Sequence, residues 1–317
     1  MISLTRSEIE ALIDLPAAAD AIEAAYRAAS SGDVNLPPVG HITFPDRDAD
    51  CHIKYGHVKG DRTFVIKVAT GFPQNDQRGL PGGNGIVLVM SAETGTVQAI
   101  LHDEMVLTDI RTGLGGAVAS RTLARTDSKR VLVVGTGPQA RRQIEAHAVL
   151  MPQLSFAVWG RDSGKAAQLV VEMSDNFDVT SAPDLQIAAR QADIIVTATG
   201  STTPLLVSDW VQPGTHITAV GADAPGKQEL DVALIARADV LAVDLASQCL
   251  DHGEVSHAAQ SGLIRPGDLT EIGTLLQGSG LGRTDERQIT VADLTGIAAQ
   301  DIAMANAVLH AWRMQNL

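Results

Sequence analysis

Residues 131–140 read VLVVGTGPQA, an apolar run that passes directly into a glycine-rich turn. The apolar run predicts a buried strand, and residues 139–151 predict the helix that follows it. In the pattern G-x-G-x-x-A, the first glycine permits a tight turn, the second lets a pyrophosphate approach the backbone, and the small last residue lets helix and strand pack closely. The start of such a helix also offers N–H groups to phosphates. We therefore predict a dinucleotide-binding loop formed by Gly135, Thr136, Gly137, Pro138, Gln139 and Ala140.

The segments after this loop alternate between apolar strands and helices. A helix is expected at residues 163–173, and strands are expected at 155–159, 193–198, 216–220 and 240–243. Such alternation is typical of a parallel sheet that is covered by helices on both faces. The predicted fold class is therefore α/β, with a Rossmann-type doubly wound parallel sheet.

The N-terminal part has a different order of predicted helices and strands. A capping box that begins at Thr5 predicts a short helix, and Pro16 suits the first turn of a second one. Small residues dominate residues 108–124, which favours a helix packed closely on its neighbour, and residues 301–315 predict a terminal helix. Strands with turn signals between them are expected at residues 64–69, 85–90 and 96–101. Their close spacing predicts an antiparallel sheet.

Composition narrows the possible partners. A length of 317 residues favours two domains over one core. The chain carries 24 Lys and Arg against 37 Asp and Glu, a net charge of −13, so neither nucleic acid nor an anionic membrane is expected as a partner. The two cysteines, Cys51 and Cys249, exclude a disulfide scaffold. No apolar run is long enough for a membrane helix and no signal peptide is recognised, so a cytoplasmic protein is expected.

The end of the second Rossmann strand is expected to read the adenosine ribose. Here it continues as Arg161, Asp162 and Ser163. An arginine offers a cation to a 2′-phosphate, whereas an acid accepts hydrogen bonds from a free 2′-hydroxyl. Asp162 lies one residue beyond the position at which an acid would accept hydrogen bonds from the 2′-hydroxyl. The sequence therefore favours NADP(H) and leaves NAD(H) as the alternative.

Further motifs extend along the whole chain. They are Lys67 with GFPQN at 71–75, GLP at 79–81, LTDIRT at 107–112, GADAPGKQEL at 221–230, GE at 253–254 with HA at 257–258, and DLTG at 293–296 with QD at 300–301. Together with the loop at Gly135, these motifs resemble the ornithine cyclodeaminase/mu-crystallin family over nearly the full length.

The resemblance implies a subunit of two domains and a homodimer. Residues 1–120, completed by a C-terminal helix at 298–317, would form a smaller α+β domain for substrate binding and dimerisation. Residues 121–297 would form the Rossmann domain. The resemblance also implies hydride transfer between a nicotinamide and the Cα of a small amino or imino acid. No metal is expected, because the histidines near Glu254 lack the spacing of a zinc motif.

Four residues are candidates for binding the substrate. Lys67 and Arg111 match the carboxylate-binding cations of the family, and an arginine binds a carboxylate bidentately. Family members often carry a further arginine after the proline near residue 38, which this chain lacks, and Lys54 is a candidate replacement. Asn84 is a weaker candidate for a direct contact.

The resemblance also assigns the catalytic and remaining cofactor residues. Asp223 matches the catalytic acid/base, with Lys227 in the same loop as a candidate to orient it, and Lys67 is a second catalytic candidate. The other cofactor-binding candidates are Thr112, Thr197, Ala198, Val220, Thr295 and Gly296.

Three activities stay open at this point. The first is an NADPH-dependent imine reductase or amino-acid dehydrogenase, in which Asp223 protonates the substrate nitrogen. The second is a cyclodeaminase, an ammonia lyase that acts on ornithine or a related diamino acid and regenerates its NAD⁺ in each cycle. The third is a ligand-binding protein of the crystallin type without catalysis, which the presence of Lys67, Arg111 and Asp223 disfavours.

Overall fold

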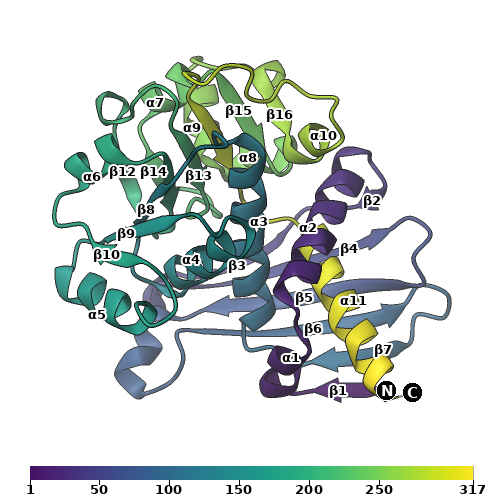
Figure 1. The fold of residues 1–317 in the computed structure, drawn as a ribbon. Helices are drawn as coiled ribbons and strands as arrows, with labels where there is room; N and C mark the ends of the chain where they lie inside the picture. The colour runs from purple at the N-terminus through teal and green to yellow at the C-terminus, as the bar shows by residue number, and fades with distance from the viewer. Residues whose placement is uncertain (317) are drawn as a thin grey trace. The chain divides into compact units, whose positions relative to one another are not determined.

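The computed structural model describes residues 1–316, which divide into two units (Figure 1). The first unit comprises Met1–Arg111 and Ile297–Leu317, and the second comprises Thr112–Gly296. From the sequence, the corresponding boundaries were expected at residues 120 and 297. The expected boundary at residue 120 and the boundary in the structure, between Arg111 and Thr112, both lie inside helix α3 (Val106–Leu123). Among the described residues, no helix is both long enough and apolar enough to cross a membrane.

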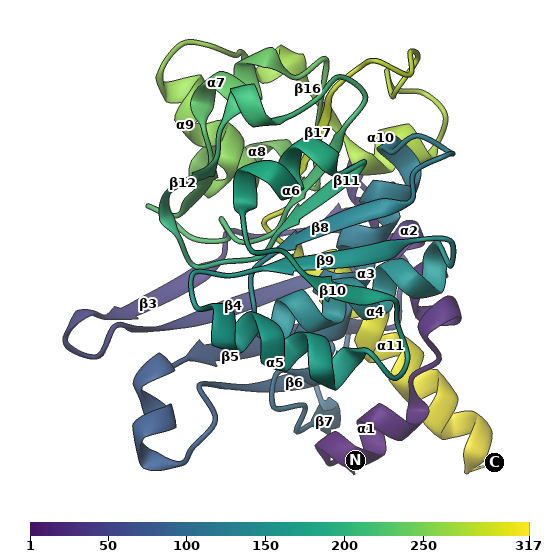
Figure 2. The same ribbon diagram turned by 60° about the vertical axis from the view of Figure 1, so that its left-hand side comes forward.

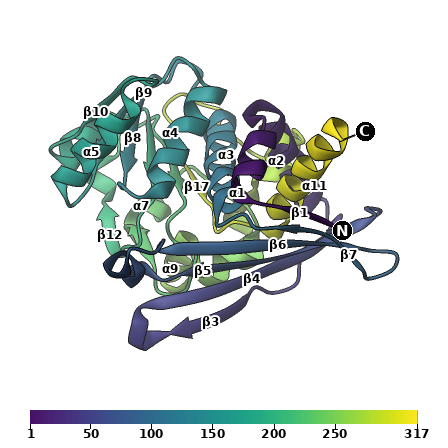
Figure 3. The same cartoon turned by 90° about the horizontal axis from the view of Figure 1, so that it is seen from below.

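The first unit is built on a mainly antiparallel sheet. Its strands follow the order β1-β7-β6-β5-β4-β2, with β3 paired to β4, and β1 alone runs parallel to its neighbour. The strands are β1 (Ile2–Leu4), β2 (Val34–Asn35), β3 (Gly40–Phe44), β4 (Ala49–Val58), β5 (Thr63–Gly71), β6 (Gly83–Ser91) and β7 (Val97–Leu101). Figure 3 shows α1 (Arg6–Leu12), α2 (Leu15–Ser30) and α11 (Ala298–Gln315) together on one side of this sheet. The predicted antiparallel sheet is confirmed, and Thr5 forms the predicted capping box with Glu8.

The second unit is a Rossmann-type parallel sheet, as predicted. Its strand order is β10-β9-β8-β11-β13-β17-β15-β16. These strands are β8 (Arg130–Val134), β9 (Ser155–Trp159), β10 (Val179–Ser181), β11 (Ile194–Thr197), β13 (His216–Ala219), β15 (Val240–Val243), β16 (Leu269–Glu271) and β17 (Thr290–Asp293). A separate pair is formed by β12 (Thr202–Leu206) and β14 (Gln228–Leu230). The sequence did not indicate β10, β16 or β17, which are short or lack the helix that would precede them.

Helices cover both faces of the parallel sheet. Figure 2 shows α4 (Pro138–Leu150) and α5 (Ser163–Met173) on one side of β8 and β9, with α6 (Leu185–Gln191) on the other. The other helices of this unit are α7 (Val232–Arg237), α8 (Ala246–His252), α9 (Glu254–Gln260) and α10 (Ile272–Leu276). Alternate residues of β8 enter two separate cores, Val131 and Val133 with α4 and α5, and Leu132 and Val134 with α6 to α9. Each face of the strand is therefore apolar, as a doubly covered sheet requires.

Helix α3 packs on α4 at unusually short range. A Cβ added at Gly113 would lie 2.6 Å from the backbone oxygen of Arg142, and one added at Gly116 would collide with the Gln143 side chain. Gln143 in turn donates a hydrogen bond to the backbone oxygen of Thr112. The run of small residues thus sets the distance between the two helices, as the sequence predicted.

Gly113→Ala should lower the free energy of unfolding by about 1–3 kcal/mol, because the added methyl group meets backbone that cannot move aside. Denaturant unfolding measures this loss. The matched control is Gly267→Ala, where an added Cβ has no atom within 4 Å and its φ is not positive. Equal stabilities of the two variants would contradict the packing argument.

Candidate active site

The glycine-rich loop of the second unit has the geometry that a pyrophosphate site needs. Gly135 has φ +140°, and a Cβ there would lie 2.6 Å from the backbone oxygen of Ala198. Gly137 is the N-cap of α4, and a Cβ at that position would meet no atom within 4 Å, so the space above it is open. Ala140 is fully buried against the sheet. These features fit a dinucleotide whose phosphates lie over Gly137 at the start of α4.

The loop lies where the order of the parallel strands reverses. Strand β8 has β9 on one side and β11 on the other, and the chain continues outward from each. Ligands of open α/β sheets bind beyond the carboxyl ends of the strands at this switch point. Ala198, directly after β11, and Thr136, which packs against Gly160 after β9, both belong to that edge.

The two candidate ribose-binding residues at the end of β9, Arg161 and Asp162, have different environments. Asp162 is the N-cap of α5, and its Oδ1 accepts hydrogen bonds from the backbone N–H groups of Gly164 (2.9 Å) and Lys165 (3.2 Å). Arg161 is exposed, and none of the acidic side chains that the structure describes forms an ion pair with it. The carboxylate of Asp162 is thus used inside the protein, whereas the guanidinium of Arg161 faces solvent.

Glu229 connects the loops that follow β11 and β13, although it was not among the predicted site residues. Its carboxylate accepts hydrogen bonds from the hydroxyls of Thr197 and Thr199, each 2.7 Å long, and from the backbone N–H of Gly221 at 3.0 Å. Burial raises the pKa of Glu229, and these hydrogen bonds oppose the rise. Thr197 therefore supports the backbone at this edge through its side chain. Val220 is buried and donates its N–H to the backbone oxygen of Thr197.

The loop after β17 is held by a second buried carboxylate. Asp244 accepts a hydrogen bond from the Thr295 hydroxyl (3.1 Å) and from the backbone N–H of Gly296 (2.6 Å). Gln248 donates to the same hydroxyl and to the backbone oxygen of Gly296. Gly296 has φ +76°, a conformation that favours glycine. The backbone of these two cofactor-binding candidates is thus held by hydrogen bonds.

Asp223 lies in the loop after β13 with about half of its side chain exposed. The ammonium of Lys227 lies 2.6 Å from its Oδ1, so the predicted partnership of these two residues is present. Nε2 of His257 donates a hydrogen bond to the backbone oxygen of Lys227 (2.9 Å), which ties the loop to α9. The carboxylate is therefore positioned and still accessible.

In the first unit, three charged side chains form a buried cluster. The Asp301 carboxylate on α11 lies 2.9 Å from the Lys67 ammonium on β5 and 3.3 Å from Nε of Arg111 on α3. Burial would raise the pKa of Asp301, but the two cations bring it below its usual value. Burial lowers the pKa of Lys67, and Asp301 opposes this shift. The second oxygen of Asp301, Oδ2, has no hydrogen-bond partner among the described residues.

Lys54 joins this cluster from the neighbouring strand. It is directly opposite Lys67 in the β4–β5 pairing, so both side chains lie on the same face of the sheet, and both are buried. The fifth charge is Asp103, whose pKa burial raises to about 6 and whose Oδ2 accepts a hydrogen bond from the backbone N–H of Leu107. Three buried cations and two carboxylates therefore lie in one cluster, and ammonium and guanidinium groups are donors that suit a carboxylate.

Asn84 and Thr112 are less closely connected with the candidate sites. Asn84 pairs with Thr70 of β5. Thr70 is three residues after Lys67, and side chains alternate between the two faces of a strand. Thr70 and its partner Asn84 therefore lie on the opposite face of the sheet from Lys67. The structure does not bring Asn84 together with the buried cations. Thr112 on α3 has its backbone oxygen occupied by Gln143 of α4.

Fold and loop together define a dinucleotide-binding protein of the Rossmann class. Residues 1–316 match the ornithine cyclodeaminase/mu-crystallin family, and this chain belongs to that family. It is 39% identical over 307 residues to the uncharacterized cyclodeaminase y4tK of Sinorhizobium fredii, covering 95% of this chain and 93% of that protein. It is 33% identical over 306 residues to the alanine dehydrogenase of Archaeoglobus fulgidus, covering 96% of this chain and 93% of the relative.

Solved structures agree with this assignment. An archaeal alanine dehydrogenase dimer with bound NAD superimposes with a TM-score of 0.91 at 32% identity, covering 100% of this chain and 97% of that one. The Δ¹-pyrroline-2-carboxylate reductase of Thermococcus litoralis, in complex with NADH and L-proline, gives a TM-score of 0.93 at 25% identity, covering 100% of this chain and 99% of that one. The resemblance inferred from the motifs is therefore confirmed.

Asp293, a buried acid at the end of β17, makes the stability of the protein depend on pH. Asp293 accepts a hydrogen bond from the backbone N–H of Val255 through Oδ2, while Oδ1 has no partner among residues 1–316. Burial raises its pKa from 3.8 to about 7. Between these values the folded protein binds more protons than the unfolded chain, so the free energy of unfolding falls as the pH rises through this window.

Asp293→Asn should flatten this dependence, because an amide does not titrate. Thermal unfolding of both proteins from pH 5 to pH 8 measures the difference. The wild-type melting temperature should fall more steeply toward pH 8 than that of the variant. Parallel curves would show that Asp293 titrates at its ordinary pKa.

Proposed function

We propose that this protein is a nicotinamide-dependent oxidoreductase that transfers a hydride between the cofactor and the Cα of a small amino or imino acid. The observation that carries the proposal is the placement of three buried cations, Lys54, Lys67 and Arg111, around the Asp301 carboxylate. Ammonium and guanidinium groups are the side-chain donors that bind carboxylates most strongly, and here they are held ready for the carboxylate of a substrate. Relatives that bind NADH with L-proline, or are named alanine dehydrogenase, support a substrate of this class.

Each group of the chain has a distinct role in the proposed reaction. Arg111 and Lys67 bind the α-carboxylate, and Lys54 adds the charge that an arginine near residue 38 supplies in other members. Asp301 holds both cations in place at distances of 2.9 and 3.3 Å. A bound reduced nicotinamide supplies the hydride that reduces the C=N bond. Asp223 supplies the proton to the nitrogen, and Lys227 holds that carboxylate in position.

We further propose NADP(H) as the preferred cofactor and NAD(H) as the weaker one. Asp162 is used as a helix cap, which leaves Arg161 as the charged group at the end of β9. The protein should also be a homodimer, since the archaeal alanine dehydrogenase is a dimer.

The direct experiment follows nicotinamide absorbance with purified protein. NADPH and NADH are tested separately against cyclic imino acids and against keto acids with ammonia or an amine. Stoichiometric consumption of cofactor is the expected result. Nucleotide binding without any consumption, together with ammonia release from a diamino acid, would instead identify the protein as a cyclodeaminase.

Asp223→Asn should reduce turnover by about 10²–10⁴-fold, because the amide cannot donate the proton. Nucleotide affinity should stay within about twofold of the wild type. Steady-state kinetics and a nucleotide titration measure the two quantities. Near-normal turnover would remove Asp223 from the reaction.

Arg161→Ala should weaken NADPH binding about tenfold or more and leave NADH binding nearly unchanged, since only NADPH carries the 2′-phosphate. Fluorescence titration with both cofactors measures this ratio. Arg190→Ala, on a neighbouring helix of the same unit, is the control for a general loss of positive charge. An equal loss for NADPH and NADH would contradict the ribose-phosphate assignment.

A further inference from the structure

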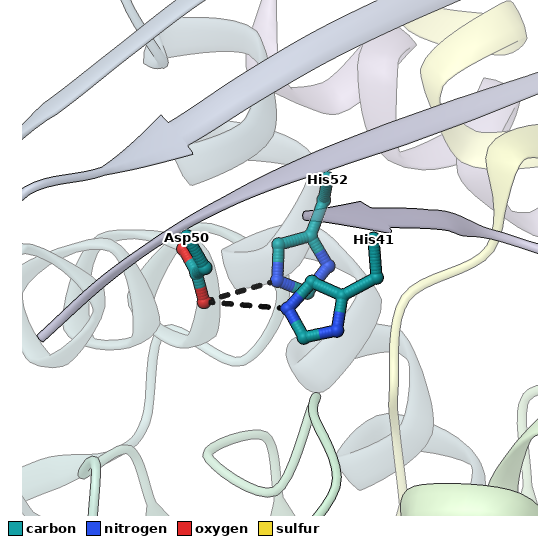
Figure 4. A group of neighbouring side chains, drawn as sticks. All are labelled: His41, Asp50 and His52. Atoms are coloured by element: carbon teal, nitrogen blue, oxygen red, sulfur yellow. Dashed lines mark hydrogen bonds and ion pairs between the residues drawn. The ribbon is translucent and has the colours of Figure 1, made fainter. Parts of the chain in front are cut away.

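His41, Asp50 and His52 form a cluster on the β3–β4 hairpin that the proposed reaction does not use (Figure 4). His41 and His52 are directly opposite each other in the antiparallel pairing. Asp50 precedes His52 by two residues on the same strand, so its side chain lies on the same face. Three side chains from two adjacent strands therefore converge without help from any loop.

The distances within the cluster suit a metal ion. Nε2 of His52 lies 3.2 Å from Oδ2 of Asp50, and Nε2 of His41 lies 3.9 Å from the same oxygen. All three potential ligand atoms lie within 4.8 Å of one another. Bonds of about 2.0–2.1 Å to a tetrahedral ion would place the ligands roughly 3.4 Å apart. Small side-chain rotations are enough to reach that arrangement.

Hydrogen bonding alone does not account for the cluster. His52 forms a hydrogen bond with Asp50, but Nε2 of His41 is too far from that carboxylate to form a second one. The centres of the two imidazole rings nevertheless lie 4.4 Å apart, with their planes tilted by 37°. Figure 4 shows a ring nitrogen of each histidine directed at the same oxygen. One ion bound by all three groups would join Nε2 of His41 to the pair that His52 and Asp50 already form.

The backbone under the cluster positions the carboxylate. Asp50 pairs with Gly71 of β5, and a Cβ at position 71 would lie 2.9 Å from Oδ1 of Asp50. A larger residue at 71 would therefore displace the aspartate. Asp50 and His52 are only half-buried and His41 is exposed, so an ion has a path from solvent.

We propose that His41, Asp50 and His52 bind one divalent transition-metal ion of the zinc class, with a coordination position left open. Two imidazoles and one carboxylate are the donor set that zinc accepts, whereas calcium and magnesium require oxygen ligands. The three ligands are not among the residues of the buried cation cluster. The site lies on the same face of β4 as Lys54, which follows His52 by two residues.

Metal titration of the full-length protein tests the proposal without reference to its activity. Chelator-treated protein is titrated with ZnCl₂ by calorimetry. The wild type should bind one equivalent, and His41→Ala and His52→Ala should each weaken binding at least tenfold. His310→Ala, an exposed histidine on α11, is the matched control and should bind like the wild type.

A second measurement begins with the wild type, so its main result does not depend on the folding of any variant. Co²⁺ in place of Zn²⁺ should give the intense visible absorption bands of a tetrahedral site with the wild-type protein. Gly71→Ala should reduce Co²⁺ affinity through displacement of Asp50 while both histidines remain. The proposal is overturned if the wild type binds no Zn²⁺, if it gives no such bands, or if the two histidine variants bind Zn²⁺ like His310→Ala.

Discussion

The carboxylate of Asp301, buried between the cations of Lys67 and Arg111, is the interaction on which the first unit depends. A buried ion requires its partners, so the C-terminal helix α11 must pack against strand β5 and the start of α3. The two parts of the first unit are thereby joined, although the 185 residues of the Rossmann unit, Thr112–Gly296, lie between them in the sequence. The same contact holds the two cations that we propose for the substrate carboxylate, so removal of Asp301 would affect both stability and binding.

The second unit depends on close contacts between backbone segments and on buried carboxylates that accept hydrogen bonds from backbone N–H groups. Gly135 lies so close to Ala198 that no side chain fits between the loop and β11. Glu229 and Asp244 then hold the loops that surround the carboxyl edge of the sheet. A cofactor that meets this edge finds a backbone that is already ordered, which reduces the entropy lost on binding.

Much of this arrangement could be predicted from the sequence because it depends on local signals. The glycine pattern at 135–140 and the capping box at Thr5 each act over a few residues, and both are present in the structure. The family motifs also contain Asp301, but nothing local indicates that its carboxylate is buried against Lys67. Glu229 was not selected for the same reason, since its four donors come from two separate segments, residues 197–199 and Gly221. The convergence of His41 with His52 requires the register of β3 on β4, which composition does not specify.

The measurement that tests the central claim most directly compares two cyclic imines that differ only in the α-carboxylate, Δ¹-pyrroline-2-carboxylate and Δ¹-pyrroline. Their reduction is followed by the loss of NADPH absorbance at matched concentrations. If the buried cations bind the carboxylate, the carboxylated imine should be reduced with a kcat/KM at least a hundredfold higher, about 2.7 kcal/mol in transition-state free energy. Equal reduction of both imines would show that Lys54, Lys67 and Arg111 have no role in substrate binding.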